Sequence, residues 1–248
     1  MSDFAEQIRD TFRRGDSDGV VRLAEAEIAR ARVAGDPAGE VEALYSLARV
    51  AARGGDLEES RRLASAALDV AVRAGDRRLE ERPRHVLAAV TRMSGDLVAA
   101  RGLYEASIAL NEELGHAETV TTETHNLAFT ELHLGDLDRA RELFARSREA
   151  VFARGYDAFV PYVGVGAAAL ASAERDHARA ARMLGLAESA FAAAGQVPDP
   201  DDAEELRRIR DAAVAALGPD GFATEHDAGT ALDPVSELSS ARRTRTVD

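Results

Sequence analysis

Residues 124–151 read THNLAFTELHLGDLDRARELFARSREAV, which predicts two amphipathic helices joined at Gly135-Asp136. Glycine enters the left-handed conformation that closes a helix without the strain that a Cβ atom causes. Aspartate is a preferred N-cap, because its carboxylate accepts hydrogen bonds from the first amides of the next helix. We therefore expect this stretch to fold back on itself as a helical hairpin.

The same turn recurs along most of the chain. Glycine occupies positions 15, 35, 55, 75, 95, 115, 135, 155 and 195, in equal steps. The single missing position holds Arg175. Aspartate follows the glycine at positions 16, 36, 56, 76, 96 and 136. Each interval then holds one helix of about 16–18 residues and a tight turn, so the spacing predicts an all-α chain.

Alternate intervals differ, so the repeating unit is a pair of helices, A and B, that spans two of these steps. Leucine-alanine pairs precede the mid-unit glycines at 47–48, 87–88 and 127–128, and Ala167-Ala168 takes the same place in the last unit. A small residue stands five positions after the mid-unit turn, at Ser60, Ala100, Ala140 and Ala180. Small residues at such spacings let antiparallel helices approach closely.

This pattern resembles the tetratricopeptide repeat. HEAT and armadillo repeats have units of similar length, but the mid-unit glycine and the small residue after it favour the tetratricopeptide interpretation. The resemblance implies a right-handed superhelical solenoid of five hairpins, at 2–34, 36–74, 76–114, 116–154 and 156–194. Residues 195–238 are predicted to be a linker and capping helices, with a helix near 201–217 closed by Gly218-Pro219, and 239–248 a disordered tail. Pro83 and Pro161 predict irregular helix starts near 76–83 and 156–161.

From Ala178 onward the sequence is similar to the C-terminal end of bacterial transcriptional regulators of the LuxR-type and antibiotic-regulator ATPase families. In those families a tetratricopeptide array follows an NTPase module. The present chain has no GxxxxGK motif, and no helix-turn-helix remains once the repeats are assigned. The resemblance therefore implies a partner-sensing array without an ATPase or a DNA-binding domain.

Composition excludes several kinds of chemistry. The chain has a net charge of −13 and contains neither cysteine nor lysine, so arginine is its only strongly basic residue. A P-loop lysine, a Schiff-base lysine, a cysteine nucleophile and thiolate metal sites are thus excluded. The acidic balance disfavours direct nucleic-acid binding, and no apolar run approaches the ~18 residues of a membrane span. We expect a cytoplasmic, noncatalytic protein without a cofactor or metal.

Equivalent positions of successive units are expected to stack into rows on neighbouring A helices, which line the concave groove of such an array. These rows bring arginines next to aromatic and histidine side chains, and arginine binds carboxylates through two parallel hydrogen bonds. We therefore expect the groove to hold a protein or peptide segment that is acidic or bears carboxylates. The candidate partner-binding residues are Arg9, Tyr45, Arg49, Arg82, His85, Arg92, His125, Asn126, Phe129, His133 and Tyr162.

Other interpretations of these residues stay open. Arginine is scattered over the whole chain, so several would lie in any groove, and Tyr45 and His85 equally suit packing between A helices. His125 and His133 lie eight positions apart without a third ligand, which argues against zinc. Two other functions are also compatible with the sequence. One is a regulatory subunit that senses a ligand or signal peptide for a separate transcription factor, and the other is a scaffold that self-associates as a homo-oligomer.

Overall fold

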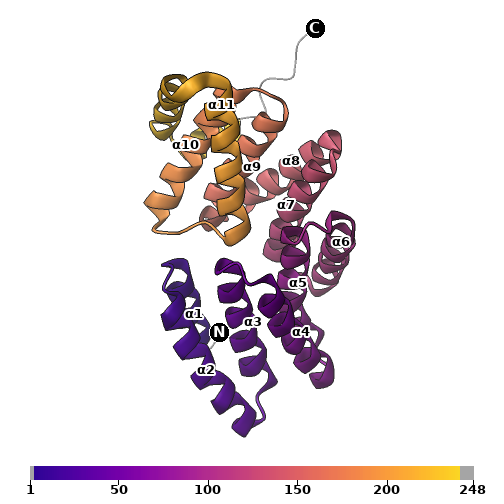
Figure 1. The fold of residues 1–248 in the computed structure, drawn as a ribbon. Coiled ribbons are helices and arrows are strands. Elements are labelled where there is room, and N and C mark those ends of the chain that lie inside the picture. Colours follow the sequence, from indigo (N-terminus) through magenta and orange to yellow (C-terminus); the bar gives the residue numbers. More distant parts are fainter. Residues whose placement is uncertain (1–2, 241–248) are drawn as a thin grey trace. The chain divides into compact units, whose positions relative to one another are not determined.

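The computed structural model describes residues 3–240, and within this range every regular element is a helix (Figure 1). The helices are α1 (Asp3–Arg13), α2 (Ser17–Ala34), α3 (Pro37–Arg53), α4 (Leu57–Ala74), η1 (Arg77–Glu80), α5 (Glu81–Met93), α6 (Leu97–Leu114), α7 (Ala117–Leu134), α8 (Leu137–Arg154), η2 (Asp157–Phe159), α9 (Val160–Ala173), α10 (His177–Ala194), α11 (Pro200–Thr230) and α12 (Pro234–Ser240). The predicted all-α, paired-helix architecture is confirmed.

The turns have the chemistry that the glycine spacing predicts. The glycines that close α2, α4, α6, α8 and α10 are left-handed, with φ between +61° and +74°. At the start of α8 the Asp136 carboxylate accepts a hydrogen bond from the amide of Arg139 at 3.0 Å. The same cap begins α2, α3, α4, α6 and α10. Helix length is thus fixed at both ends by local interactions.

The two helices that contain Pro83 and Pro161 start irregularly, as predicted. A short 3₁₀ helix, η1, precedes α5, and another, η2, precedes α9. Proline lacks an amide hydrogen and tolerates only the first turn of an α-helix. The α-helices consequently begin at Glu81 and Val160, just before Pro83 and Pro161.

The chain divides into two compact units, residues 1–120 and 121–248, with the boundary inside α7. In the N-terminal unit each helix packs on the next, and α3 also contacts α1 and α5. The small residues five positions after each mid-unit turn, Ser60, Ala100, Ala140 and Ala180, are fully buried. The sequence predicted a different division, into a repeat array at 1–194 and capping helices at 195–238. That division follows the sequence repeats, whereas the two compact units follow contacts within the structure, so it stays a prediction.

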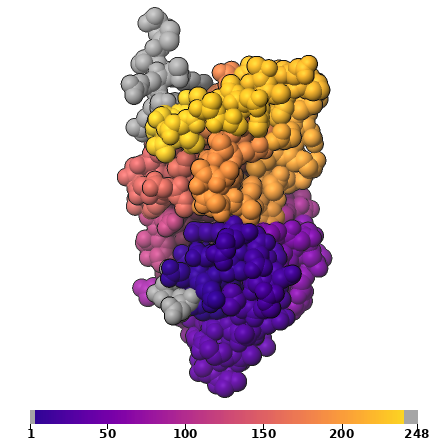
Figure 2. Space-filling view, turned by 90° about the vertical axis from the view of Figure 1, so that its left-hand side faces the viewer, coloured from indigo at the N-terminus to yellow at the C-terminus, as the bar shows by residue number. Residues whose placement is uncertain are grey.

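In the C-terminal unit α11 covers α10 and α9, and α10 and α11 lie side by side in orange and yellow (Figure 2). The backbone of α11 breaks at Gly218, with φ 73° and ψ 164°, and Pro219 follows. This break confirms the predicted end of the helix at Gly218-Pro219. The predicted tail falls mostly on 241–248, outside the described residues.

Two glycines set the closest contact between α10 and α11. A Cβ atom on Gly185 would lie 2.2 Å from the carbonyl oxygen of His226, and one on Gly229 would lie 1.9 Å from that of Arg182. Ion pairs flank the crossing, with Arg182 Nε 2.7 Å from Glu225 Oε2. The second half of α11 is therefore held against α10 by backbone-to-backbone packing that only glycine permits.

A repeated arginine joins each of two B helices to the A helix that follows it. Arg61 of α4 donates to Thr91 Oγ1 and Ser94 Oγ at the end of α5, each at 3.3 Å. Arg141 holds the equivalent position of α8, two units later, and donates to Glu174 Oε1 at 2.9 Å, at the end of α9. A cation at this point also meets the negative end of the helix dipole.

Replacing Arg175 by glycine is expected to stabilise the protein, because Arg175 holds the left-handed turn position at φ +62°. A side chain there costs about 1 kcal/mol relative to glycine. The midpoint of thermal unfolding should rise by about 2–4 °C. The matched control is Gly135→Arg, at the equivalent turn one unit earlier (φ +87°), which should lower it. A lower midpoint for Arg175→Gly would contradict this account of the turn.

Gly185→Ala and Gly229→Ala are each expected to destabilise the protein by about 1–3 kcal/mol in urea unfolding, since the new methyl group meets backbone atoms. Gly102→Ala provides the control, because Gly102 lies within α6 with nothing within 4 Å of the added Cβ. The Gly102→Ala change should instead raise the free energy of unfolding by about 0.5–1 kcal/mol. Equal effects at all three positions would show that helix propensity, not the close crossing, governs α11.

Candidate partner-binding site

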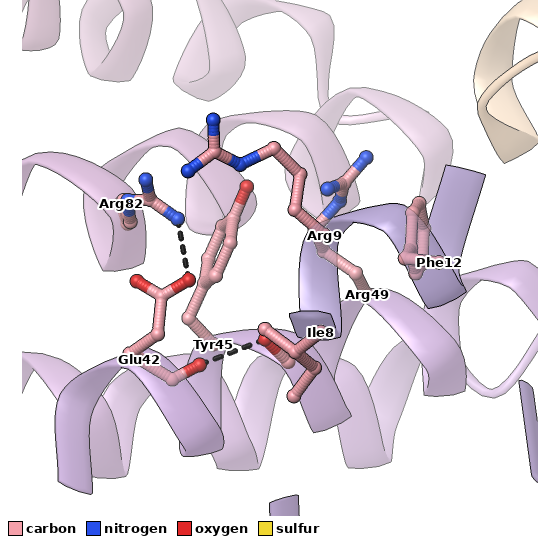
Figure 3. Close-up of a pocket in the computed structure, with 8 residues that line it drawn as sticks. Ile8, Arg9, Phe12, Glu42, Tyr45, Arg49 and Arg82 are labelled. Carbon is pink, nitrogen blue, oxygen red and sulfur yellow. Dashed lines mark hydrogen bonds and ion pairs between the residues drawn. The ribbon is translucent and has the colours of Figure 1, made fainter. Parts of the chain in front are cut away.

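A small pocket of the N-terminal unit brings together part of the predicted set. Its lining comes from three A helices, with Ile8, Arg9 and Phe12 from α1, Glu42, Tyr45, Ser46 and Arg49 from α3, and Arg82 from α5 (Figure 3). Four of the predicted residues, Arg9, Tyr45, Arg49 and Arg82, therefore surround one pocket. We call these eight residues the arginine pocket.

Helix α3 is the centre of the arginine pocket. Its contribution falls at positions 42, 45, 46 and 49, a spacing that places side chains on one face of a helix. An adjacent face of α3 is apolar and packs into the core through Leu44, Ala48 and Ala52. The helix thus holds the pocket side chains on a rigid base.

Stacking on aromatic rings fixes two of the arginines. The guanidinium carbon of Arg49 lies 3.7 Å from the centroid of the Phe12 ring and 5.6 Å from that of Tyr45. The guanidinium carbon of Arg82 also lies near Tyr45, 5.2 Å from the ring centroid. A guanidinium that stacks by its face donates hydrogen bonds through its edges.

Phe12 also anchors α1 to α3. Arg53 stacks on its ring at 3.5 Å and donates to the Phe12 carbonyl oxygen at 2.9 Å. The Phe12 side chain is 3% exposed. Because Arg9 lies one turn earlier on α1, this anchor also positions Arg9 at the pocket.

Glu42 supplies the single carboxylate of the lining. Its Oε1 atom lies 2.6 Å from Arg82 Nη1 (Figure 3), and its side chain is 14% exposed. Burial raises the pKa of Glu42 above its ordinary value, although Arg82, Arg9 and Arg49 each favour the ionised form. The ionised carboxylate is thus kept in place at an energetic cost.

The lining suits binding rather than catalysis. Ser46 is buried and donates its hydroxyl to the Glu42 backbone carbonyl at 2.8 Å, so that hydroxyl is not aimed at a base. The free volume is about 10 Å³, the least that admits one water molecule. A pocket of this size takes no whole metabolite, and the head group of a partner side chain enters it only where a lining side chain moves aside. Three arginines and a tyrosine make a carboxylate the best-matched head group.

The structure corrects the expected groove position of His125 and Phe129 on α7. His125 and Phe129 are 2% and 1% exposed, so they are core side chains and not groove residues. The His125 ring makes edge contacts at 5.2 Å with the rings of Phe129, Phe144 and Phe159. Gly166 packs against His125 and Phe144. Four rings converge here, which the row pattern alone could not indicate.

The other candidates are not part of the pocket lining. His133 is paired with Glu205 of α11, at 3.0 Å between Nε2 and Oε2. Arg92 is 7% exposed, which also corrects its assignment to an open groove. Tyr162 is half-buried and stacks on Phe159 at 5.1 Å. His85 on α5 and Asn126 on α7 are both half-buried, so their roles in partner binding stay predictions.

Sequence reasoning missed the part that Glu42 plays. The signal was present, because Glu42 and Arg82 lie 40 residues apart and so occupy the same row on adjacent A helices. Opposite charges in one row predict an ion pair between neighbouring units. Ser46 and Ile8, which complete the lining, carry no such signal, because small and apolar residues occur on every face of these helices.

Comparison with known proteins agrees with the repeat interpretation. Residues 40–113, which include most of α3 and all of α4 to α5, match the tetratricopeptide repeat family. BtubC (BKLC) from P. vanneervenii has a similar structure, with a TM-score of 0.56 at 20% identity over 100% of this chain and 95% of that one. A Rap protein complexed with Competence and Sporulation Factor has a TM-score of 0.68 at 14% identity. That match covers 95% of this chain and 65% of the Rap chain.

Among curated proteins, none matches the chain. No helix within residues 3–240 is long and apolar enough to cross a membrane. The same part of the chain contains no cluster of histidine, aspartate or glutamate side chains arranged for a metal ion.

Replacing Glu42 by glutamine should change how stability depends on pH. The folded-state pKa of Glu42 is raised above the ordinary 4.5, so between those two values the folded protein binds more protons than the unfolded chain. The wild-type free energy of unfolding therefore has a contribution that falls as pH rises through this window. The variant lacks it, so the stability of Glu42→Gln relative to wild type should rise with pH there and then level off. Urea unfolding at closely spaced pH values measures this, and a constant difference would contradict it.

Proposed function

We propose that this protein is a noncatalytic adaptor that binds a carboxylate-bearing protein or peptide segment on the face shared by its A helices. Tetratricopeptide repeats generally mediate protein–protein interactions. The arginine pocket is the observation that carries the finer proposal. It joins three successive A helices at one point, and its lining is rich in the donors that bind carboxylates.

The size and chemistry of the pocket support a macromolecular partner. A space of about 10 Å³ takes a head group only in exchange for a lining group, so most of the affinity must come from contacts beyond it. Aromatic and arginine side chains dominate binding energy in many protein interfaces, because they are large and cluster in well-packed, water-excluding pockets. Tyr45, with Arg49 and Arg82 beside its ring, fits this description.

A regulatory subunit that senses a signal molecule is the second candidate. The likeness to a Rap protein supports it, because the Rap protein in that structure is complexed with Competence and Sporulation Factor. Both candidates place a partner on the helical repeats, and they differ in what the partner is. Self-association as a scaffold stays a prediction.

The proposal is tested by selecting random dodecapeptides on the wild-type protein and measuring their affinity by fluorescence anisotropy. Selected peptides should be enriched in aspartate and glutamate. They should bind at least about tenfold more weakly to an Arg9→Gln/Arg82→Gln variant, since each charged hydrogen bond contributes about 1.5–3 kcal/mol.

Arg62→Gln is the control for loss of an arginine outside the pocket, because Arg62 is exposed on α4 and pairs with Glu59. That variant should bind the selected peptides as wild type does. Thermal unfolding of each variant separates lost binding from lost folding. Peptides without acidic residues, or acidic peptides that bind the double variant equally well, would contradict the proposed site.

A further inference from the structure

Glu42 lies where a partner's carboxylate would be received. Its carboxylate contacts Arg82 at 2.6 Å inside the arginine pocket, and its stem belongs to the helix that carries Tyr45 and Arg49. A glutamate of the chain itself and a glutamate of a partner present the same chemical group to the same guanidinium. The two are alternatives for one position in a space of about 10 Å³.

From this geometry we propose that Glu42 is an internal competitor, which occupies Arg82 in the partner-free protein and is displaced by the incoming carboxylate. The inference rests on the proposed function and adds a mechanism of regulation to it. Partner binding is then an exchange of one ion pair for another, and its net gain comes from the contacts around the pocket. Glu42 thereby weakens the binding of any partner whose only favourable contact is a carboxylate, and it favours partners that also contact the residues around the pocket.

The exchange has a consequence for protons. When a partner carboxylate takes Arg82, Glu42 loses its nearest cation and faces a new anion, and both changes favour its protonated form. The charged groups around Glu42 are Arg82 and Glu81 of α5, Arg9 of α1 and Arg49 of its own helix. Burial already disfavours the ionised carboxylate in the partner-free protein. Partner binding should therefore take up a proton, and affinity should increase as the pH falls towards the pKa of Glu42.

The test uses a fluorescein-labelled tetraglutamate peptide with an amidated C-terminus, and tetraglutamine as its neutral counterpart. At pH 7, Glu42→Gln should bind tetraglutamate about tenfold more tightly than wild type, which corresponds to about 1.4 kcal/mol. As the pH is lowered from 7, the wild-type affinity should rise, whereas the affinity of the variant should change much less. Neither protein should bind tetraglutamine.

Glu40→Gln separates competition from a general change in charge. Glu40 lies on the same helix and pairs with Arg32 at 2.7 Å, outside the arginine pocket. This control alters the net charge equally and should leave the affinity within about twofold of wild type. An equal gain from Glu40→Gln and Glu42→Gln would overturn the inference.

Carbon-13 NMR of the glutamate carboxyl groups gives a second readout, with the Glu42 signal assigned by its loss in Glu42→Gln. Saturating tetraglutamate should raise the pKa of Glu42 in the wild-type protein. If wild type binds the peptide through Arg82 and Glu42→Gln binds it with no higher affinity, Glu42 is not an internal competitor, and the proposed function stands. If neither protein binds the peptide, both are overturned.

Discussion

The turn that closes one helix and begins the next, a left-handed residue followed by an aspartate cap, is the constraint on which the rest of the fold depends. The left-handed residue recurs at a constant interval, and the aspartate cap follows it before α2, α3, α4, α6, α8 and α10. The turn therefore sets helix length and returns the chain to the same register after every pair of helices. Side chains at equivalent positions of successive units then meet on neighbouring A helices. The ion pair between Glu42 and Arg82 is a direct product of that register.

The same register produces both structural and functional contacts. On the B helices it sets Arg61 and Arg141 against the ends of the following A helices. On the A helices it gathers the arginines of the pocket around Tyr45. Neighbouring helices approach closely because small residues follow each mid-unit turn, so the polar groups of adjacent units come within hydrogen-bond reach. A site built from the A helices of three successive repeats thus needs no loop residues.

Much of this was predictable from the sequence, because the decisive signals are local. Glycine spacing predicted the helix boundaries, proline predicted the irregular starts of α5 and α9, and the row pattern predicted four residues of the arginine pocket. For His125 and Phe129 of α7, the structure differs from the expected groove position for a physical reason. A row position specifies which side chains lie in line, but not what covers them, and at His125 three phenylalanine rings from α7, α8 and η2 close over the row. Pairing of His133 with α11 likewise depends on a helix outside the repeat pattern.

The central claim is that a carboxylate of the partner binds at Arg82 in place of Glu42. A crystal structure of the protein with a selected acidic peptide tests it most directly. We expect a peptide carboxylate within hydrogen-bond distance of the Arg82 guanidinium, with the Glu42 side chain turned away from it. A peptide bound elsewhere, or one bound while the contact between Glu42 and Arg82 stays intact, would contradict the account.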